Sequence, residues 1–486
     1  MGNIIIINAS DSDECRIARL KDNKLEEFHI ETTGREIIKG NIYKATITRI
    51  EDSLQAVFVD YGGERQGFLQ KEEIHSDYFL DNHSGRKSLN DIVSCGQELI
   101  VQITKDPILK KGAMLTTFVS LPGRHVVLMP GSNSVGVSRK IEDETERTRL
   151  KDIIDKLKIP EGFGVIIRTV SVDSTKSVIS KDINYLLKLW EDINKKALNE
   201  KAPAILYKER NLSLRSIRDY FNPEVTEIVV DDNAIFQEIK TFMNIISPKH
   251  TRLVKLYNGE KPIFSKYKIE DKISSIFENQ VKLKSGGTIV IEQTEALVAI
   301  DVNSGKATQK KSLEDTAMQT NLEACEEIAR QLRLRDLGGI IVIDFIDMKD
   351  SKHRAKVEKA MKTHLKVDKA RVKVGRLSKL GLLEVSRQRL SPPIEYGTFV
   401  TCKHCQGKGL IPSIESLGAG CIRQVRIEML REGITGVKVK VPVEVASYLL
   451  NKKRKEILEL EMMREIPITI EPDNNLPPGK NEIICE

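Results

Sequence analysis

Positions 296–305 read ALVAIDVNSG and positions 338–347 read GGIIVIDFID, two apolar stretches that each end in acidic residues. A continuous apolar run that is rich in β-branched residues predicts a strand buried on both faces of an α/β sheet. Residues 313–337 have apolar positions at helical spacing and precede two glycines, where a helix is expected to end. These stretches therefore predict a β–α–β unit with parallel strands.

The parallel pairing would bring Asp301 and Asp344 to the same end of adjacent strands. Asn303 follows two residues after Asp301, and carboxylate and amide oxygens are hard ligands suited to Mg²⁺ or Mn²⁺. An aspartate at the end of a strand is also a common helix cap or turn residue. Because two acidic strand ends occur in one unit, the residues alone leave metal chemistry and a structural role about equally favoured.

Length and composition indicate a multidomain globular protein. The 486 residues exceed what one hydrophobic core supports and predict about three or four domains. The formal net charge of +7, from 77 Lys+Arg and 70 Asp+Glu, is a mild excess that permits a nucleic-acid partner. No basic segment precedes the short apolar run at the N-terminus, and no stretch approaches a membrane span. We therefore expect no signal peptide and a cytoplasmic location.

Short alternating strands with glycine-rich turns fill residues 36–120, which predicts a small closed barrel. This segment resembles an OB-fold of the ribosomal protein S1 type, whose surface aromatics stack on unpaired bases. Phe58 and Phe68 match the aromatic positions of that fold, and Lys111 matches a phosphate-contacting position. Because Phe58 lies in the apolar run AVFVDY, a place in the barrel core is the alternative interpretation.

Two basic segments suggest contacts with phosphate. Arg168 and Thr169 follow the strand-like sequence GVII, which places a guanidinium and a hydroxyl at a strand end, although the dipeptide is common. Residues 371–390 form the densest positive segment, which begins at Arg371 and is predicted to be a basic strand followed by a helix. A basic strand beside the acidic pair would suit an anionic backbone that lies across a metal ion.

Cys402 and Cys405 form the only CxxC pair among seven cysteines, and the glycines that follow are typical of a zinc knuckle. Reduced thiols are expected elsewhere, because the other cysteines are scattered singly. A structural Zn²⁺ needs four ligands. Cys421 and His404 could supply the rest, the pair could be redox-active, or two chains could each donate one knuckle. The last arrangement is geometrically simplest, since it gives four sulfurs across a twofold axis.

Longer motifs occur in order along the chain. They are LPGRHVVLMP, GVIIRT, DVNSG, TNLEACEEIARQLRLRDLGGIIVIDFIDM, GLLEVSRQRLSP and the CxxCxGxG knuckle. Together they resemble the ribonuclease E/G family over essentially the whole chain, with a length closer to the short ribonuclease G type. The resemblance implies a Mg²⁺-dependent endoribonuclease that cleaves single-stranded RNA, often 5′-monophosphorylated, in rRNA and tRNA maturation and in mRNA decay.

The resemblance also implies roles for individual residues. Asp301 and Asp344 would hold the catalytic Mg²⁺, with Asn303 orienting Asp301 or the RNA. Cys402 and Cys405 would bind a structural Zn²⁺ shared between protomers, in homodimers that pair into tetramers. The implied pocket for a 5′-monophosphate consists of Gly123, Val127, Arg168 and Thr169.

The implied architecture is a multidomain α/β fold in which one RNase-H-like subdomain is split by insertions. In chain order it comprises the first RNase-H-like segment (1–35), an S1-type OB-fold RNA-binding domain (36–120), a 5′-phosphate sensor region (121–214), the second RNase-H-like segment (215–278), a DNase-I-like catalytic subdomain (279–400), a zinc link (401–414) and a small α/β dimerisation domain (415–486). The alternative is a non-catalytic RNA-binding or assembly protein that uses the OB-fold and a zinc-linked dimer. The presence of both acids, Asp301 and Asp344, favours the enzyme.

Overall fold

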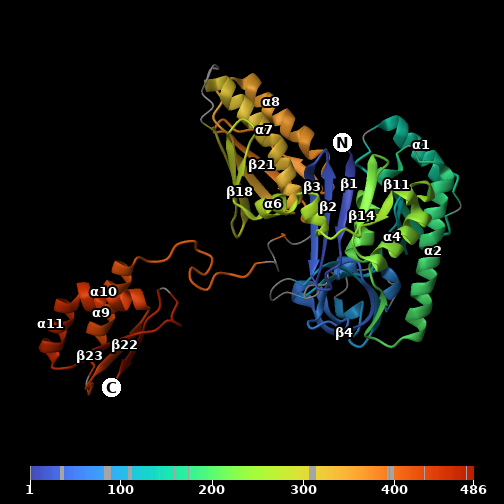
Figure 1. Cartoon of the computed structure of the whole chain (residues 1–486). Helices are drawn as coiled ribbons and strands as arrows, with labels where there is room; N and C mark the ends of the chain where they lie inside the picture. The colour runs from blue at the N-terminus through green and yellow to red at the C-terminus, as the bar shows by residue number, and fades with distance from the viewer. Residues whose placement is uncertain are drawn as a thin grey trace. The chain divides into compact units, whose positions relative to one another are not determined.

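A computed structural model of the chain describes residues 2–32, 38–80, 89–107, 112–141, 143–157, 159–172, 174–305, 313–390, 393–394, 399–431, 433–477 and 479–486. It divides into two compact units, Met1–Glu395 and Tyr396–Glu486 (Figure 1). Within the described ranges, no helix has the length and apolar character needed to cross a membrane. Among the described residues, the first unit contains four sheets and the second contains one.

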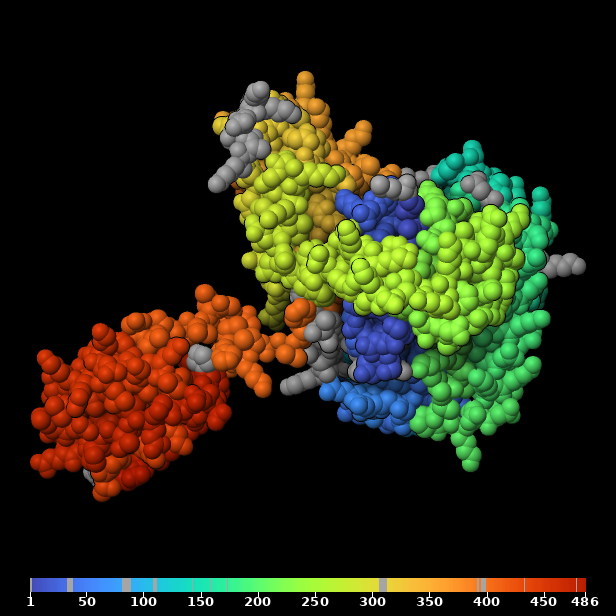
Figure 2. All heavy atoms as spheres, viewed as in Figure 1, coloured from blue at the N-terminus to red at the C-terminus, as the bar shows by residue number. Residues whose placement is uncertain are grey.

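The first sheet joins the N-terminal strands to a segment far along the chain. Its order is β15-β14-β1-β2-β3, with β1 parallel to β14 and antiparallel to β2. In Figure 2 the blue surface of the N-terminal strands lies against the yellow-green surface that follows residue 220. The members and their helices are β1 (Asn3–Asn8), β2 (Glu14–Lys21), β3 (Lys24–Thr32), α3 (Leu212–Tyr220), β14 (Val225–Val230), α4 (Asn233–Ile246), β15 (Val254–Leu256), α5 (Ile263–Lys266) and α6 (Glu270–Ser274).

The second sheet closes into the predicted barrel, because β4 pairs with both β5 and β7. Val57 and Val59 on β5 are fully buried inside it. A short strand from the predicted sensor region, β13, adds to the edge of β4, so this region is not separate from the barrel. The strands are β4 (Ile42–Glu51), β5 (Ala56–Asp60), β6 (Gly67–Gln70), β7 (Glu98–Lys105), β8 (Met114–Thr116) and β13 (Ala204–Tyr207).

The third sheet has the order β11-β12-β10-β9 and packs against the long helix α2. Ile179, Ile183 and Leu186 lie on one face of α2 and are buried in this contact. The elements are β9 (Leu121–Pro122), β10 (Val126–Pro130), β11 (Val135–Val137), α1 (Glu144–Asp155), β12 (Phe163–Ile167) and α2 (Lys176–Asn199).

The fourth sheet carries the two acid-ended stretches. β18 (Leu297–Asn303) and β19 (Gly339–Asp344) pair in parallel, and α7 (Leu313–Leu334) connects them, which confirms the predicted β–α–β unit. The sheet has the order β16-β17-β18-β19-β21-β20. Its other elements are β16 (Gln280–Lys282), β17 (Thr288–Gln293), α8 (Ser351–Leu365), β20 (Val372–Val374) and β21 (Leu382–Arg387).

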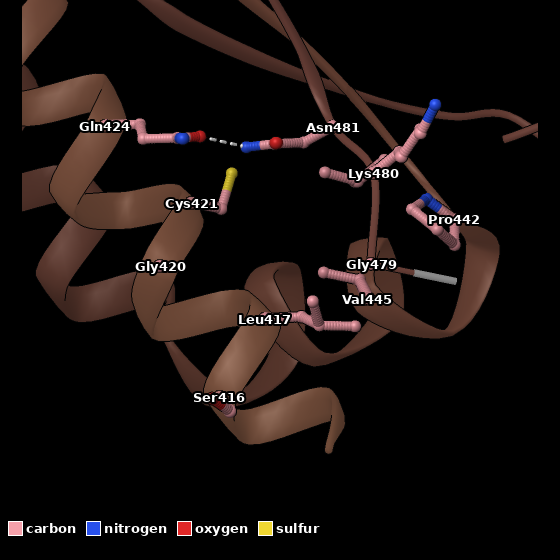
Figure 3. Close-up of a pocket in the computed structure, with 11 residues that line it drawn as sticks. Ser416, Leu417, Gly420, Cys421, Gln424, Pro442, Val445, Gly479, Lys480 and Asn481 are labelled. Atoms are coloured by element: carbon pink, nitrogen blue, oxygen red, sulfur yellow. Dashed lines mark hydrogen bonds between the residues drawn. The ribbon is translucent and has the colours of Figure 1, made fainter. Parts of the chain in front are cut away.

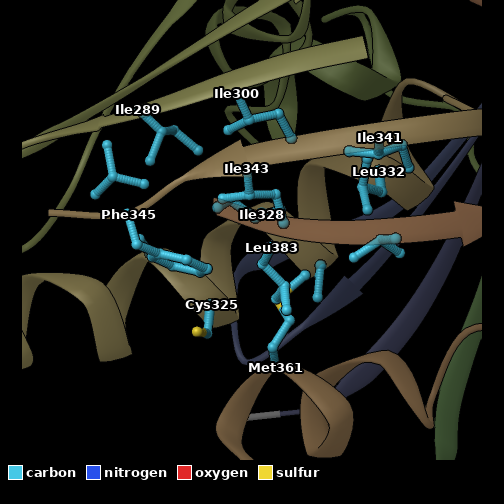
Figure 4. Packing of buried hydrophobic residues seen from close by; sticks show 14 of the residues in the cluster. Ile289, Ile300, Cys325, Ile328, Leu332, Ile341, Ile343, Phe345, Met361 and Leu383 are labelled. Atoms are coloured by element: carbon cyan, nitrogen blue, oxygen red, sulfur yellow. The ribbon is translucent and has the colours of Figure 1, made fainter. Parts of the chain in front are cut away.

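The prediction that β18 and β19 are buried on both faces is wrong. Ile300 is buried, whereas its neighbours on the opposite face, Asp301 and Asn303, are exposed. Ile328 of α7 and Met361 of α8 belong to the core on the covered face (Figure 4). The sheet order shows the reason. The steps from β18 to β19 and from β19 to β20 run in the same direction, so right-handed crossovers place both helices on one side.

The predicted helix near the end of the basic segment is also wrong. Residues 382–387 form strand β21, which pairs antiparallel with both β19 and β20. Leu383 and Val385 are buried, and Glu384 between them is exposed, which is the period of a strand with one covered face. Gly381, with φ of +81°, makes the turn into this strand.

The second unit, Tyr396–Glu486, contains a small three-stranded sheet with helices. β22 (Val437–Val441) is central, with β23 (Ile468–Pro472) parallel and β24 (Glu482–Cys485) antiparallel to it. The helices are α9 (Ile414–Glu428), α10 (Val443–Lys452) and α11 (Arg454–Arg464). Cys421 and Gln424 of α9 line a cavity of about 150 Å³ together with Asn481, which donates a hydrogen bond to Gln424 (Figure 3).

Candidate active site

Asp301 and Asp344 are direct register partners on adjacent strands. Residues on one strand alternate between faces, so both carboxylates and Asn303 lie on the face that α7 and α8 leave open. The alternation of side chains along β18 and β19 therefore exposes the acids. The neighbouring strand ends are about 5 Å apart, which is close enough for both side chains to reach one small ion.

Local contacts hold this pair in place. Asn303 Nδ2 donates a hydrogen bond of 2.8 Å to Asp301 Oδ2, which fixes one carboxylate relative to its own strand. A Cβ at Gly381 would lie 3.4 Å from Asp347 Oδ1 and 3.8 Å from Asp344 Oδ1. Partial burial and the carboxylates of Asp301 and Asp347 together raise the pKa of Asp344. The site is therefore a concentration of negative charge that favours a cation.

The donor set matches the requirements of Mg²⁺. This ion keeps several water ligands and is usually bound by one or two carboxylates together with substrate phosphates. Asp301 and Asp344 supply two such carboxylates on an open face. Across the described part of the chain, no set of three or more His, Cys, Asp or Glu side chains converges as a preformed metal site. The pair thus suits a cation shared with a bound phosphate better than a cation enclosed by protein.

Arg371 lies farther from the acids than predicted. Val372 on β20 pairs with Arg387 on β21, and Arg387 pairs in turn with Gly339 on β19. Arg371 therefore aligns with the position six residues before Asp344. At about 3.3 Å per residue this offset is about 20 Å along the sheet. Arg371 is exposed, and the register places it on the open face with Lys373. Arg371 and Lys373 thus form a basic group at the edge of the face that carries Asp301 and Asp344, but away from these two acids.

The barrel presents the expected aromatic pair on its outer surface. Phe58 and Phe68 are register partners with ring centroids 5.7 Å apart in an edge-to-face arrangement. Both are half-buried, so the interpretation of Phe58 as a core residue is wrong. The Arg49 guanidinium lies 4.3 Å from the centre of the Phe58 ring and adds a positive charge to this surface. Lys111, the predicted phosphate contact, lies outside the described residues.

The four residues of the predicted phosphate pocket lie near one another at the ends of β10 and β12. Arg168 Nη1 donates to the Gly123 carbonyl at 2.6 Å, and Val127 pairs with the adjacent strands. Thr169 is exposed at the start of a short 3₁₀ helix. Arg168 Nη2 also donates to Asp219 Oδ1 at 2.7 Å, so an incoming phosphate would compete with this carboxylate.

Charges beneath the pocket are held by specific partners. The carboxylate of Asp182 on α2 accepts backbone hydrogen bonds from His125 at 2.7 Å and Val126 at 3.1 Å. A Cβ at Gly123 would lie 2.5 Å from Asp182 Oδ2, so any larger residue would force this carboxylate to shift. Burial lowers the pKa of His125 to about 4, and the nearby Arg168 adds to the lowering. The imidazole is therefore neutral at pH 7.

The knuckle holds its two thiols in one turn. The backbone N–H groups of Gly407 and Gly409 and the side chain of Cys402 lower the pKa of the Cys405 thiol, which favours the thiolate form that binds metals. Cys421 is buried on α9 beside its own cavity (Figure 3). Among the residues that the structure places, no third thiol, imidazole or carboxylate joins Cys402 and Cys405 in a metal-binding group.

Comparison with known families gives three matches along the chain. The model described as "Ribonuclease E/G family" matches residues 120–390. The chain belongs to the ribonuclease E/G family. Within this family member, residues 36–106 match the S1 RNA binding domain, which confirms the predicted type of the barrel. Residues 401–485 match the thioredoxin-like domain of RNase E/G.

Similar curated proteins fall into two length classes. Ribonuclease E of Haemophilus influenzae is 45% identical over 472 residues, which cover 96% of this chain and 50% of that protein. Ribonuclease E of Escherichia coli K12 is 44% identical, covering 95% of this chain and 44% of that protein. Ribonuclease G of Escherichia coli K12 is 35% identical, covering 96% of this chain and 97% of that protein. The chain thus spans about half the length of these ribonuclease E relatives and nearly all of ribonuclease G.

Two residues beside the predicted sites escaped the sequence reasoning. Asp219 binds Arg168 across a separation of 51 residues, and no local pattern links the two positions. Arg49 meets Phe58 across the β4–β5 pair, where alternation within a recognised hairpin could have indicated a shared face.

Proposed function

We propose that this chain is a Mg²⁺-dependent endoribonuclease that hydrolyses phosphodiester bonds in single-stranded RNA. The single observation that carries the proposal is the register pairing of Asp301 with Asp344 on the open face of the fourth sheet. The S1 domain provides an RNA-binding module in the same unit. The names of the relatives support the same chemistry.

The chain's own residues have distinct tasks in this proposal. Asp301 and Asp344 hold the cation, and Asn303 keeps the Asp301 carboxylate in position through its 2.8 Å hydrogen bond. Bound there, Mg²⁺ would activate water and offset charge on the scissile phosphate. Phe58 and Phe68 offer rings on which unpaired bases stack. Such stacking stabilises RNA binding by roughly 1–3 kcal/mol per base. Single-strand preference follows because bases in a duplex are already stacked on one another.

The decisive experiment uses the purified full chain and a structured RNA labelled at its 5′ end. Incubation with Mg²⁺ should give discrete products from internal cleavage in single-stranded segments, and incubation with EDTA should give none. Mapping both new ends distinguishes an endonuclease from an exonuclease. Intact RNA at all Mg²⁺ concentrations, with normal RNA binding, would instead support a non-catalytic RNA-binding role.

We further propose that Arg168, Thr169, Gly123 and Val127 receive a 5′-monophosphate. Arg168→Ala should reduce cleavage of 5′-monophosphate RNA toward the rate for 5′-hydroxyl RNA and leave the latter rate unchanged. The expected preference in the wild type is modest, because the phosphate must compete for Arg168 with the carboxylate of Asp219, which lies 2.7 Å away. The measurement is the initial rate on matched oligonucleotides. Equal rates on both substrates for the wild-type protein would remove the sensing role.

Cys402 and Cys405 are proposed to share one Zn²⁺ with the same residues of a second protomer. Replacing both by serine should abolish the metal-linked dimer, because serine hydroxyls are poor Zn²⁺ ligands. Sedimentation velocity should then show monomers, and metal analysis should show loss of about half a zinc per chain. Cys95→Ser is the matched control at an exposed cysteine. An unchanged mass for the double variant would assign the knuckle to a single chain or to redox chemistry.

A further inference from the structure

A buried asparagine on α7 contacts the loop between two of the acidic residues. Asn321 is fully buried, on the same face of α7 as Ala317, Ala324 and Cys325. The face packs into the hydrophobic core, where a polar amide is costly unless its hydrogen bonds are satisfied. The buried side-chain amide of Asn321 therefore requires a specific polar partner.

That partner is the backbone of Ile346. Asn321 Nδ2 donates to the Ile346 carbonyl at 2.8 Å, and the Ile346 N–H donates to Asn321 Oδ1 at 3.1 Å. The side-chain amide therefore pairs with one residue through both of its groups, as an adjacent strand would. Ile346 lies two residues after Asp344 and one residue before Asp347, so this contact fixes the backbone that carries both carboxylates.

Other bonds fix the same loop from different directions. The Phe345 N–H donates to the Gly381 carbonyl at 3.1 Å, and Phe345 itself is buried. Glu314 at the start of α7 accepts the backbone N–H groups of Lys349 at 3.2 Å and Asp350 at 3.0 Å. Among these contacts, Asn321 is the one whose side chain both donates to and accepts from a residue between the two acids.

We propose that Asn321 is a positioning residue that sets the orientation of Asp344 for binding a divalent cation. The inference rests on the proposed function. Without the amide, the Ile346 N–H and C=O lose their partners, and the loop must shift to recover them from water. Residues that orient metal ligands through hydrogen bonds typically change metal affinity by about 10–100-fold when replaced.

The test measures cation binding as well as catalysis. Asn321→Leu keeps the approximate volume and removes both hydrogen bonds. Titration of the RNA-free full chain with Mn²⁺, followed by electron paramagnetic resonance, should show at least tenfold weaker binding at the site that Asp301→Asn abolishes. The Mg²⁺ concentration for half-maximal cleavage should rise in parallel, while the affinity for RNA in EDTA should stay within twofold of the wild type.

Gln331→Leu is the matched control. Gln331 is 1% exposed on the same helix, donates a hydrogen bond to Glu327 and accepts one from Arg335. Its replacement therefore also removes two hydrogen bonds from a buried amide, but at a position remote from the acids. Its Mn²⁺ affinity should match the wild type. Asn321→Ser is measured in the same way, and its Mn²⁺ affinity should be at least threefold weaker than that of the wild type. This variant tests the positioning role if Asn321→Leu does not fold.

The outcomes separate the positioning role from the proposed function. Mn²⁺ affinity within twofold of the wild type in the folded Asn321 variant overturns the positioning role, as does an equal loss in Gln331→Leu. If Asp301→Asn and Asp344→Asn cleave RNA normally, the proposed nuclease site itself fails. If those two variants are inactive and Asn321→Leu binds Mn²⁺ normally, only the role of Asn321 fails.

Discussion

Asp301→Asn and Asp344→Asn should each lower the cleavage rate of a short AU-rich oligonucleotide by at least about a thousandfold. Loss of one carboxylate from a site with two removes charge that the cation needs, and metal catalysis contributes several kcal/mol, where about 1.4 kcal/mol corresponds to tenfold in rate. RNA affinity, measured in EDTA by fluorescence anisotropy, should remain within twofold. The reason is that the aromatic surface of the barrel is separate from the acidic pair.

The matched control for these variants is Glu292→Gln. Glu292 is an exposed carboxylate on the neighbouring strand β17. It pairs with Ala299, which lies two residues before Asp301 and on the same face of β18. It should retain cleavage close to the wild-type rate, which separates loss of a ligand from loss of surface charge. Full activity in either aspartate variant would exclude the metal site, and a comparable loss in Glu292→Gln would show a general electrostatic effect.

Asp368→Asn should destabilise the sheet that carries β19 and β21 by up to about 3 kcal/mol, because it breaks a buried ion pair and leaves Arg387 with the more exposed Asp336 as its remaining carboxylate partner. The Arg387 and Asp368 side chains are only 2% and 1% exposed, and Arg387 Nε donates to Asp368 Oδ2 at 2.8 Å. Arg387 also donates to Asp336 and to the Leu337 carbonyl, so the pair ties the end of β21 to the chain just before β19. Hydrogen exchange of the β19 and β21 amides measures this local stability.

Asp192→Asn is the control for the same substitution at an exposed pair. Asp192 and Lys195 lie on α2 with side chains 71% and 72% exposed and a separation of 3.9 Å. Such surface pairs contribute between about 0 and 1 kcal/mol, so little change is expected. Equal, small changes in both variants would mean that water reaches Arg387 when Asp368 is replaced.

Local sequence patterns predicted most of the elements that carry the site. The β-branched runs, the helical spacing between them and the paired glycines correctly indicated β18, α7 and β19. The glycine-rich turns and the alternating apolar residues of residues 36–120 likewise predicted the barrel strands. Such signals depend only on residues that are neighbours in the sequence. The helix expected near residue 382 was wrong, since the alternation of Leu382–Arg387 is that of a strand with one covered face.

The candidate site was less predictable where it depends on contacts across long separations. Asp301 and Asp344 were identified together because a β–α–β unit fixes their relation. The placement of Arg371 beside them failed, since the offset arises from two successive antiparallel pairings. Asp219 opposite Arg168 and Asn321 beneath Ile346 had no signal at all, because each contact joins separate elements.

The sequence by itself indicated the family, the β–α–β unit and the pairing of Asp301 with Asp344, since these follow from motifs and short-range periodicity. Only the tertiary structure decided which face of the sheet that carries Asp301 and Asp344 is open. Both crossovers proceed in the same direction across the sheet, so their shared hand places α7 and α8 on one side and leaves Asp301, Asn303 and Asp344 in contact with solvent. That choice is a property of the whole sheet, and no single segment encodes it.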